Sequence, residues 1–198
     1  MMVIGLTGSI AMGKSEAAKY LSSLGFPVFD SDAEVHLLYD SKQGADLIRP
    51  YVPEAVVDEK VDRQKLAGVA LKDAPLLAAM SEKVHAEIKR RRESFLAKAR
   101  ASKAKAAILD IPLLYETSAE KQVDKVIVVS ADAQIQIARA MARPGMTQER
   151  LNTILSRQLP DTEKRARADA VIDNSSTLQQ MQKSLHALIV KWGLLDHA

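Results

Sequence analysis

The chain has 198 residues, of which 47% are hydrophobic and 27% charged, and its formal net charge at pH 7 is +3. This composition is typical of a globular protein, and no run of eighteen apolar residues occurs that could span a bilayer. The lack of cysteine excludes disulfides and thiolate metal sites. We expect a cytoplasmic protein without membrane or nucleic-acid partners, as a monomer or, alternatively, a small homo-oligomer.

A glycine-containing loop follows the first apolar run of the chain. Residues 8–15 read G-S-I-A-M-G-K-S, which fits the pattern G-x-x-x-x-G-K-[ST], and residues 3–7 form the apolar run before them. Such a loop binds polyphosphate when a buried strand leads into it and a helix leaves it, because loop amides and the helix N-terminus then face one anion. We therefore predict a phosphate site; the alternative is a plain strand-to-helix turn with a solvated lysine.

The residue types in this loop suit particular tasks. Gly8 and Gly13 allow a backbone geometry and a close approach to phosphate that a Cβ would obstruct. The ammonium of Lys14 can reach the β- and γ-phosphates of a nucleotide, and the hydroxyl of Ser15 can bind Mg²⁺. The loop alone thus predicts a nucleoside triphosphate ligand but not a reaction.

A second short strand follows the helix that leaves the loop. That helix is expected to end at Gly25, the strand covers residues 28–29, and a further helix is expected at residues 33–39 with Asp32 as its N-cap. A carboxylate at the end of this strand, Asp30 or Asp32, can orient an acceptor hydroxyl and take its proton, or hold a water on Mg²⁺. Capping alone is the alternative role for Asp32.

The stretch from about residue 40 to residue 105 is predicted to be helical, without strands. Asp73 and Pro75 suit the start of a long helix. The apolar residues at helical spacing in this helix are assigned to the core: Leu77, Met80, Val84, Ile88 and Phe95. Its basic run at residues 89–92 is interpreted as a solvated helix face, with a polyanion site as the alternative.

Continuous apolar runs return later in the chain and predict buried parallel strands. They lie at residues 106–110, 126–129 and 170–172. Between the last two, helices are expected at residues 133–142 and 147–157, joined by a turn; Pro160 ends the second helix. The terminal helix carries apolar residues on one face, namely Leu178, Met181, Leu185, Leu188 and Trp192.

The order of these elements predicts an α/β fold with a doubly wound parallel sheet in three layers, as in P-loop nucleotide kinases. We expect a single domain. Its core comprises residues 1–40 and about 105–198, and a helical acceptor-binding insert lies at about 41–104. Ligands are expected at the carboxyl ends of the strands.

Several motifs together resemble the dephospho-coenzyme A kinase family. They are G-L-T-G at residues 5–8 leading into the loop, D-S-D at residues 30–32, and D-I-P-L-L-Y-E at residues 110–116. Gln158 and the segment A-D-A-V-I-D-N at residues 168–174 are similar to that family as well. The resemblance covers nearly the whole chain, and it implies a nucleotide lid at about residues 143–168.

The resemblance implies transfer of the ATP γ-phosphoryl group to the 3′-hydroxyl of dephospho-CoA, giving CoA and ADP, the last step of CoA biosynthesis, with Mg²⁺ as cofactor. The catalytic residues that it implies are Asp32, Lys14 and Arg139. The residues expected at ATP are Gly8, Ala11, Met12, Gly13, Lys14, Ser15, Glu16, Arg143 and Asn174. Those expected at the acceptor are Asp30, Asp32, Asp110, Pro112 and Leu113. Mg²⁺ is expected on Ser15 and, through water, on Asp110.

Three of these assignments have structural alternatives. Arg139 and Arg143 lie four residues apart, so we place them on one helix face of the lid, where they can cover the adenine and neutralise the transferring phosphoryl group; each can also be a solvated surface charge. Leu113, with the leucine after it, can shape the acceptor site or pack under the sheet. Asn174 can contact the adenine side or be an ordinary turn residue.

The chain departs from the family at Ala11, where the family often has glycine; the anion cradle survives if the backbone there suits alanine. Two other functions remain open. One is a different P-loop small-molecule kinase, acting on a nucleoside monophosphate or a sugar acid. The other is a nucleotide-regulated module that binds nucleic acid through residues 89–92.

Overall fold

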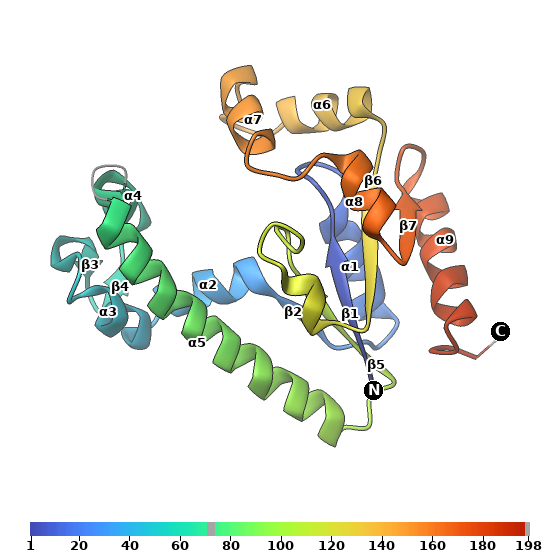
Figure 1. Ribbon diagram of the computed structural model, residues 1–198, viewed down its shortest axis with the longest axis horizontal. Coiled ribbons are helices and arrows are strands. Elements are labelled where there is room, and N and C mark those ends of the chain that lie inside the picture. The colour runs from blue at the N-terminus through green and yellow to red at the C-terminus, as the bar shows by residue number, and fades with distance from the viewer. Residues whose placement is uncertain (71–73, 197–198) are drawn as a thin grey trace. The chain divides into compact units, whose positions relative to one another are not determined.

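The structure, a computed structural model, describes residues 1–70 and 74–196 (Figure 1). Two compact units are distinguished: Met1–Val28 with Ala99–Ala198, and Phe29–Lys98. The second unit contains most of the segment that we expected to be inserted. Within the described ranges, no helix has the length and apolar character needed to cross a membrane.

The first unit is built on a parallel sheet. Its strands are β1 (Met2–Thr7), β2 (Val28–Asp30), β5 (Ala106–Asp110), β6 (Lys125–Ser130) and β7 (Ala170–Asp173), in the order β2-β5-β1-β6-β7. β1 lies between β5 and β6 and is parallel to both, and β7 is parallel to β6. All five residues of β5 are buried, as expected for a central strand covered on both faces. The predicted α/β class is confirmed.

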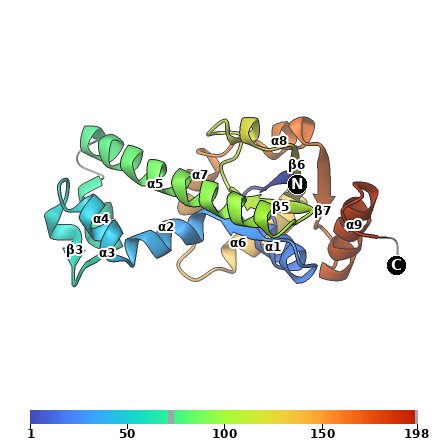
Figure 2. The ribbon, with the colours of Figure 1, turned by 90° about the horizontal axis from the view of Figure 1, so that it is seen from below.

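Helices cover both faces of this sheet, as Figure 2 shows for α8 and α1. On one face, α1 (Lys14–Ser23) and α9 (Leu178–Lys191) bury their apolar sides against β1, β5, β6 and β7. The opposite face carries η2 (Ala119–Gln122) and α8 (Asp161–Arg167). In α9 the buried residues are Met181, Leu185 and Ile189, whereas the predicted Leu178 is 46% exposed.

Two helices after β6 agree with the predicted lid helices, and a third was not predicted. α6 (Ala133–Met141) and α7 (Gln148–Leu155) follow β6 in turn. α8 then begins directly after Pro160, whose carbonyl accepts from the backbone N–H groups of Glu163 and Lys164. Pro160 therefore starts a helix rather than only ending one.

The second unit consists of helices around a small core. It contains α2 (Ser31–Tyr39), α3 (Lys42–Ile48), η1 (Pro53–Ala55), α4 (Arg63–Ala70) and most of α5 (Ala74–Ala101). The buried core residues of this unit are Leu38, Ile48, Val52, Ala55, Val61, Leu66, Met80 and Val84. A short antiparallel hairpin, β3 (Val56–Val57) with β4 (Lys60–Val61), contradicts the prediction that this stretch has no strands. Its turn residues Asp58 and Glu59 both have positive φ, as tight hairpins require.

The long helix α5 departs from the sequence prediction at the start of its apolar stripe. Met80 and Val84 are buried as expected, but Leu77 is exposed and Leu76 packs on the core instead. The predicted start at Asp73 lies outside the described residues. In the basic run, residues 89 and 90 are exposed, whereas residues 91 and 92 are partly buried, so a solvated face describes only half of it.

Candidate active site

The loop between β1 and α1 has the backbone shape of an anion cradle. Ala11 and Gly13 have φ values of 63° and 98°, and the N–H of Met12 donates to the carbonyl of Ser9. At Gly8 a Cβ would lie 2.5 Å from the carbonyl oxygen of Val129 in β6. The neighbouring strand is therefore the reason that this structure gives for glycine at position 8. The Ala11 backbone does adopt the left-handed conformation that glycine prefers.

Hydrogen bonds to other parts of the first unit hold the loop in place. Both main-chain groups of Ile10 are bound by glutamines: the Gln136 amide donates to its carbonyl at 2.9 Å, and its N–H donates to the Gln158 side-chain oxygen at 3.1 Å. The sulfur of Met12 accepts from the N–H of Ala131 at 3.0 Å. These contacts fix the loop before any ligand contributes to its shape.

Asn174 lies behind the loop rather than in an exposed turn. Its side chain is buried, and its Nδ2 donates to the carbonyl of Met12 at 2.9 Å. A Cβ on Gly13 would come within 1.9 Å of the same nitrogen. The structure thus gives Asn174 a positioning role toward the phosphate loop, where the sequence predicted a contact to ATP.

Lys14 and Asp110 form an ion pair at the ends of α1 and β5. The side chains are 15% and 2% exposed, so the pair is nearly out of solvent. An ammonium held here by a buried carboxylate has few rotamers available. Two residues predicted for phosphate and metal binding are therefore in direct contact.

In the segment after β5, the two leucines whose role the sequence left open differ in burial. Leu114 is fully buried, and its Cδ1 occupies the space where a Cβ on Gly5 would lie. Leu113 is 38% exposed. The Thr7 hydroxyl donates to the carbonyl of Pro112 at 3.1 Å, which ties this segment to the end of β1. Leu114 therefore packs under the sheet, and Leu113 remains accessible to a ligand.

Glu116 anchors the chain that returns from the lid helices. Its Oε1 accepts from the N–H of Leu159 at 2.7 Å and lies 2.9 Å from Nζ of Lys164, whose side chain is fully buried. Burial alone would raise the pKa of Glu116, but the Lys164 ion pair and the Leu159 N–H lower it below its ordinary value. Glu116 thus acts inside the first unit, where it holds the chain at Leu159 and Lys164.

The structure assigns the cap of α2 to Asp30, the last residue of β2, and not to Asp32. Asp30 is the N-cap of α2: its Oδ1 accepts from the N–H of Ala33 at 2.9 Å. Asp32 lies inside the first turn and is exposed, so the prediction that it caps the helix is wrong. Within residues 29–70 and 74–98, the Asp32 carboxylate has no hydrogen-bond or ion-pair partner. Its carboxylate is free for chemistry.

The lid arginines differ in their surroundings. Arg139 lies in the last turn of α6, and its Nη1 is buried without a hydrogen-bond partner in the described part of the chain. Arg143 lies beyond the end of α6 and is exposed, so the expected shared helix face is wrong. An unpaired buried guanidinium nitrogen is costly unless a ligand engages it, which singles out Arg139.

Oxygen donors suited to Mg²⁺ are present at the loop. Within residues 1–70 and 74–196, no group of three or more His, Asp or Glu side chains forms a ready-made metal site. Ser15, exposed at the start of α1, and the buried Asp110 are hard oxygen donors. Mg²⁺ takes few protein ligands and keeps waters and substrate phosphates, so these two groups fit it. Glu16 pairs with Lys19 at the surface.

The sequence reasoning missed the groups that hold the loop in place. Gln136 had a readable signal: it is a polar residue one turn from the buried Ala140, on the inner side of α6. Gln158 was part of the family resemblance but had no assigned task. The ion pair of Glu116 with Lys164 joins segments far apart in the sequence, and no local pattern indicates it.

Comparisons with known proteins agree with this geometry. A family model described as dephospho-CoA kinase matches residues 2–180. The dephospho-CoA kinase of Agrobacterium fabrum is 46% identical over 193 residues, covering 98% of this chain and 99% of that protein. A crystal structure of a Thermus thermophilus protein has 33% sequence identity and a TM-score of 0.82, covering 96% of this chain and 97% of its own. The dephospho-CoA kinase from Campylobacter jejuni shares the fold, with a TM-score of 0.71 at 23% identity over 96% of each chain. The chain therefore belongs to the dephospho-CoA kinase family.

Proposed function

We propose that this chain transfers the γ-phosphoryl group of ATP to the ribose 3′-hydroxyl of dephospho-CoA. The observation that carries the proposal is the Lys14–Asp110 ion pair beneath an anion-cradling loop, in a chain that matches dephospho-CoA kinases along nearly its whole length. In the reaction the hydroxyl oxygen forms a bond to the γ-phosphorus, and the bond from that phosphorus to the β–γ bridging oxygen breaks. ADP and CoA leave as products.

The residues of the first unit serve the donor. The loop amides cradle the phosphates, and the Lys14 ammonium neutralises the β- and γ-phosphate oxygens. The buried, unpaired Nη1 of Arg139 is suited to charge that develops on the transferring group. Ser15 and, through water, Asp110 would hold Mg²⁺, which supplies further charge neutralisation when it accompanies ATP.

Asp32 serves the acceptor. Because Asp30 already caps α2, the Asp32 carboxylate does not have to satisfy a backbone N–H of that helix. It can orient the 3′-hydroxyl and take its proton as the new bond to phosphorus forms. Leu113, exposed at the end of the segment after β5, and Pro112 contribute to the acceptor side. Cytoplasmic location and Mg²⁺ dependence belong to this proposal.

A coupled assay of ADP release tests the acceptor. Dephospho-CoA should support turnover far above background, whereas AMP, gluconate and shikimate should not. Lys14→Met, which removes the phosphate-neutralising charge, should nearly abolish turnover and so exclude a contaminating kinase. If dephospho-CoA gives no ADP above background and one of the other acceptors does, the chain is a different small-molecule kinase.

The role of Asp32 has its own test. Asp32→Asn should lower kcat strongly while leaving KM for ATP within about twofold, because an orienting base acts mainly in the transition state. Asp30→Asn, which keeps a capping side chain, is the matched control and should retain most of the activity. Equal kcat in the Asp32 variant and the wild type would remove Asp32 from the mechanism.

A further inference from the structure

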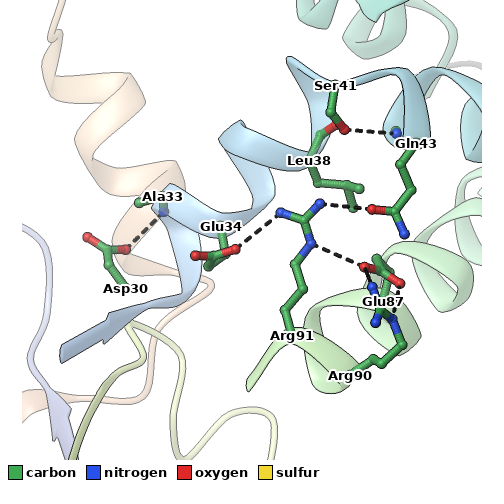
Figure 3. Close-up of polar contacts among 10 residues, drawn as sticks. Asp30, Ala33, Glu34, Leu38, Ser41, Gln43, Glu87, Arg90 and Arg91 are labelled. Atoms are coloured by element: carbon green, nitrogen blue, oxygen red, sulfur yellow. Dashed lines mark hydrogen bonds and ion pairs between the residues drawn. The ribbon is translucent and has the colours of Figure 1, made fainter. Parts of the chain in front are cut away.

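One arginine of the second unit joins three helices. Arg91, in α5, donates from Nη1 to Glu34 of α2 at 3.2 Å and from Nη2 to Gln43 of α3 at 3.0 Å (Figure 3). Its Nε donates to Glu87, one turn earlier in α5, at 3.1 Å. All three guanidinium nitrogens are thus used, each toward a different residue.

These contacts lie in a partly buried setting. The side chains of Arg91 and Glu34 are 22% and 26% exposed, and that of Glu87 is 10% exposed. Hydrogen bonds from Arg90, with further ones from Arg91, lower the pKa of Glu87 to about 2 although its burial acts in the opposite direction. Glu87 is therefore charged throughout the pH range of enzyme assays, so the anchor that orients Arg91 is permanent.

The apolar packing of the helix that Arg91 holds lies beyond its first turn, where Val35 and Tyr39 are partly buried against the core of the second unit. Leu38, in the last turn of α2, is its only buried residue. Its first turn contains Asp32 and Glu34 and is fixed by polar contacts: the Asp30 cap at Ala33, and Arg91 at Glu34.

The strand β2, which leads into α2, also packs on α5. The rings of Phe29, in the middle of β2, and Phe95 have centroids 5.4 Å apart. Arg91 and Phe95 lie four residues apart, on one face of α5. The helix α5 therefore contacts the chain on both sides of Asp32. Phe95 packs on Phe29 before Asp32, and Arg91 pairs with Glu34 after it.

We infer that Arg91 is a positioning residue for the phosphoryl transfer, which holds the first turn of α2 so that the Asp32 carboxylate stays oriented for the acceptor hydroxyl. The inference rests on the proposed function. Arg91 does not act on substrate; it acts through Glu34. Because small displacements of a catalytic group are costly in rate, loss of this support should appear mainly in kcat.

The chain offers a matched control in the neighbouring residue. Arg90 also pairs with Glu87, at 2.7 and 2.8 Å, but its side chain is 65% exposed and it forms no hydrogen bond or ion pair with α2 or α3 in the described part of the second unit. Arg91→Gln and Arg90→Gln remove the same charge from adjacent positions. Only the first removes the support of α2.

The experiment measures kinetics and hydrogen exchange on the full chain. Arg91→Gln should lower kcat by about tenfold to a hundredfold with KM for ATP within twofold, and it should speed amide exchange at residues 31–35. Arg91→Lys keeps the charge but not the fork, so it should behave like Arg91→Gln. Arg90→Gln should change neither quantity.

Variants of Glu34 test the same contact in case Arg91→Gln does not fold. Glu34→Ala removes the same contact from a partly exposed position, and Glu34→Gln keeps an acceptor; the first should match Arg91→Gln and the second should stay near wild type. Combining Arg91→Gln with Glu34→Ala should be no worse than either alone. Unchanged exchange at residues 31–35, or unchanged kcat with faster exchange, overturns the inference. If the wild type does not turn over dephospho-CoA, the proposed function fails, and exchange alone then decides whether Arg91 holds α2.

Discussion

The amide of Asn174 donates to the carbonyl of Met12 from a position 162 residues further along the chain. Met12 belongs to the phosphate loop and Asn174 follows β7, the edge strand of the sheet. The side chain is buried, so this contact exists at the cost of desolvating an amide and is worth keeping only if the loop must be held in one shape. A residue in the C-terminal part of the chain therefore holds the phosphate loop in its conformation.

Replacing Asn174 tests this dependence. Asn174→Asp places a carboxylate oxygen against the Met12 carbonyl and adds negative charge beside a phosphate site, so KM for ATP should rise at least tenfold. Asn174→Ala loses one hydrogen bond and leaves a small void, and its KM should rise less. KM values from steady-state kinetics, with the thermal midpoint of each variant as a check of folding, decide the order. An alanine variant that is worse than the aspartate variant would contradict it.

Gly13 should be intolerant of alanine for two separable reasons. Its φ is 98°, and a Cβ would lie 1.9 Å from Nδ2 of Asn174. Gly25 is the matched control, since its φ is 87° but no atom lies within 4 Å of a Cβ built there. Gly25→Ala should cost about 1 kcal/mol of unfolding free energy and leave activity unchanged, whereas Gly13→Ala should cost more and lose ATP binding.

The double variant Gly13→Ala with Asn174→Ala isolates the steric part of that effect. Removing the asparagine side chain removes the clash but not the unfavourable φ, so the double variant should be more stable than the sum of the single effects predicts. Urea unfolding of the four proteins measures this coupling. Strict additivity would mean that the clash plays no part.

Lys164 should be among the most sensitive charged residues of the chain. Its side chain is fully buried beside Glu116, so Lys164→Ala leaves a largely buried carboxylate without its counter-charge and should cost about 3 kcal/mol of unfolding free energy. Lys19→Ala breaks the exposed ion pair with Glu16 and should cost less than about 1 kcal/mol. Denaturant unfolding at pH 7 measures the loss of unfolding free energy in the two variants. Similar losses would show that the buried ion pair contributes no more to stability than the exposed one.

The pH dependence of stability should contain a contribution from Glu116. Its folded-state pKa lies below the ordinary value of about 4.3 because of Lys164 and the Leu159 N–H, so the charged form favours the folded state. This contribution is complete above that ordinary value and is lost as the pH falls through the folded-state pKa. The difference in unfolding free energy between the wild type and Glu116→Gln should therefore be largest near pH 7 and shrink below about pH 4. A difference that stays constant from pH 7 to pH 3 would refute this origin.

Much of the sheet could be predicted because its evidence is local. The runs at residues 106–109 and 126–129 are apolar throughout, and the structure has strands there. The hairpin at Val56–Val61 was missed because two-residue strands are too short to show a period of two. α8 was missed although acidic residues stand in its first turn and Lys164, Arg165 and Arg167 in its last, a charge order that favours a helix.

The helix α2 is capped by Asp30 where the sequence predicted Asp32, which shows the limit of predicting a helix cap from sequence. Both are good capping residues, and the choice depends on where the backbone turns into α2; Asp30 is still extended, with φ −90° and ψ 108°, so the helix begins after it. In the same way, Arg143 seemed to share a face with Arg139 because the spacing is helical, yet α6 ends at Met141. Spacing predicts a shared face only if the helix continues.

Ala11 carries a further consequence. Its φ of 63° is unfavourable for alanine, but its buried methyl group packs with Ala140 and Leu151 of the helices that follow β6. A glycine here would relax the backbone and lose that contact, so the two effects oppose each other. Residue 11 and its two neighbours should therefore change together in evolution: relatives with glycine at this position should be free to vary the residues that correspond to 140 and 151, and relatives with alanine should not.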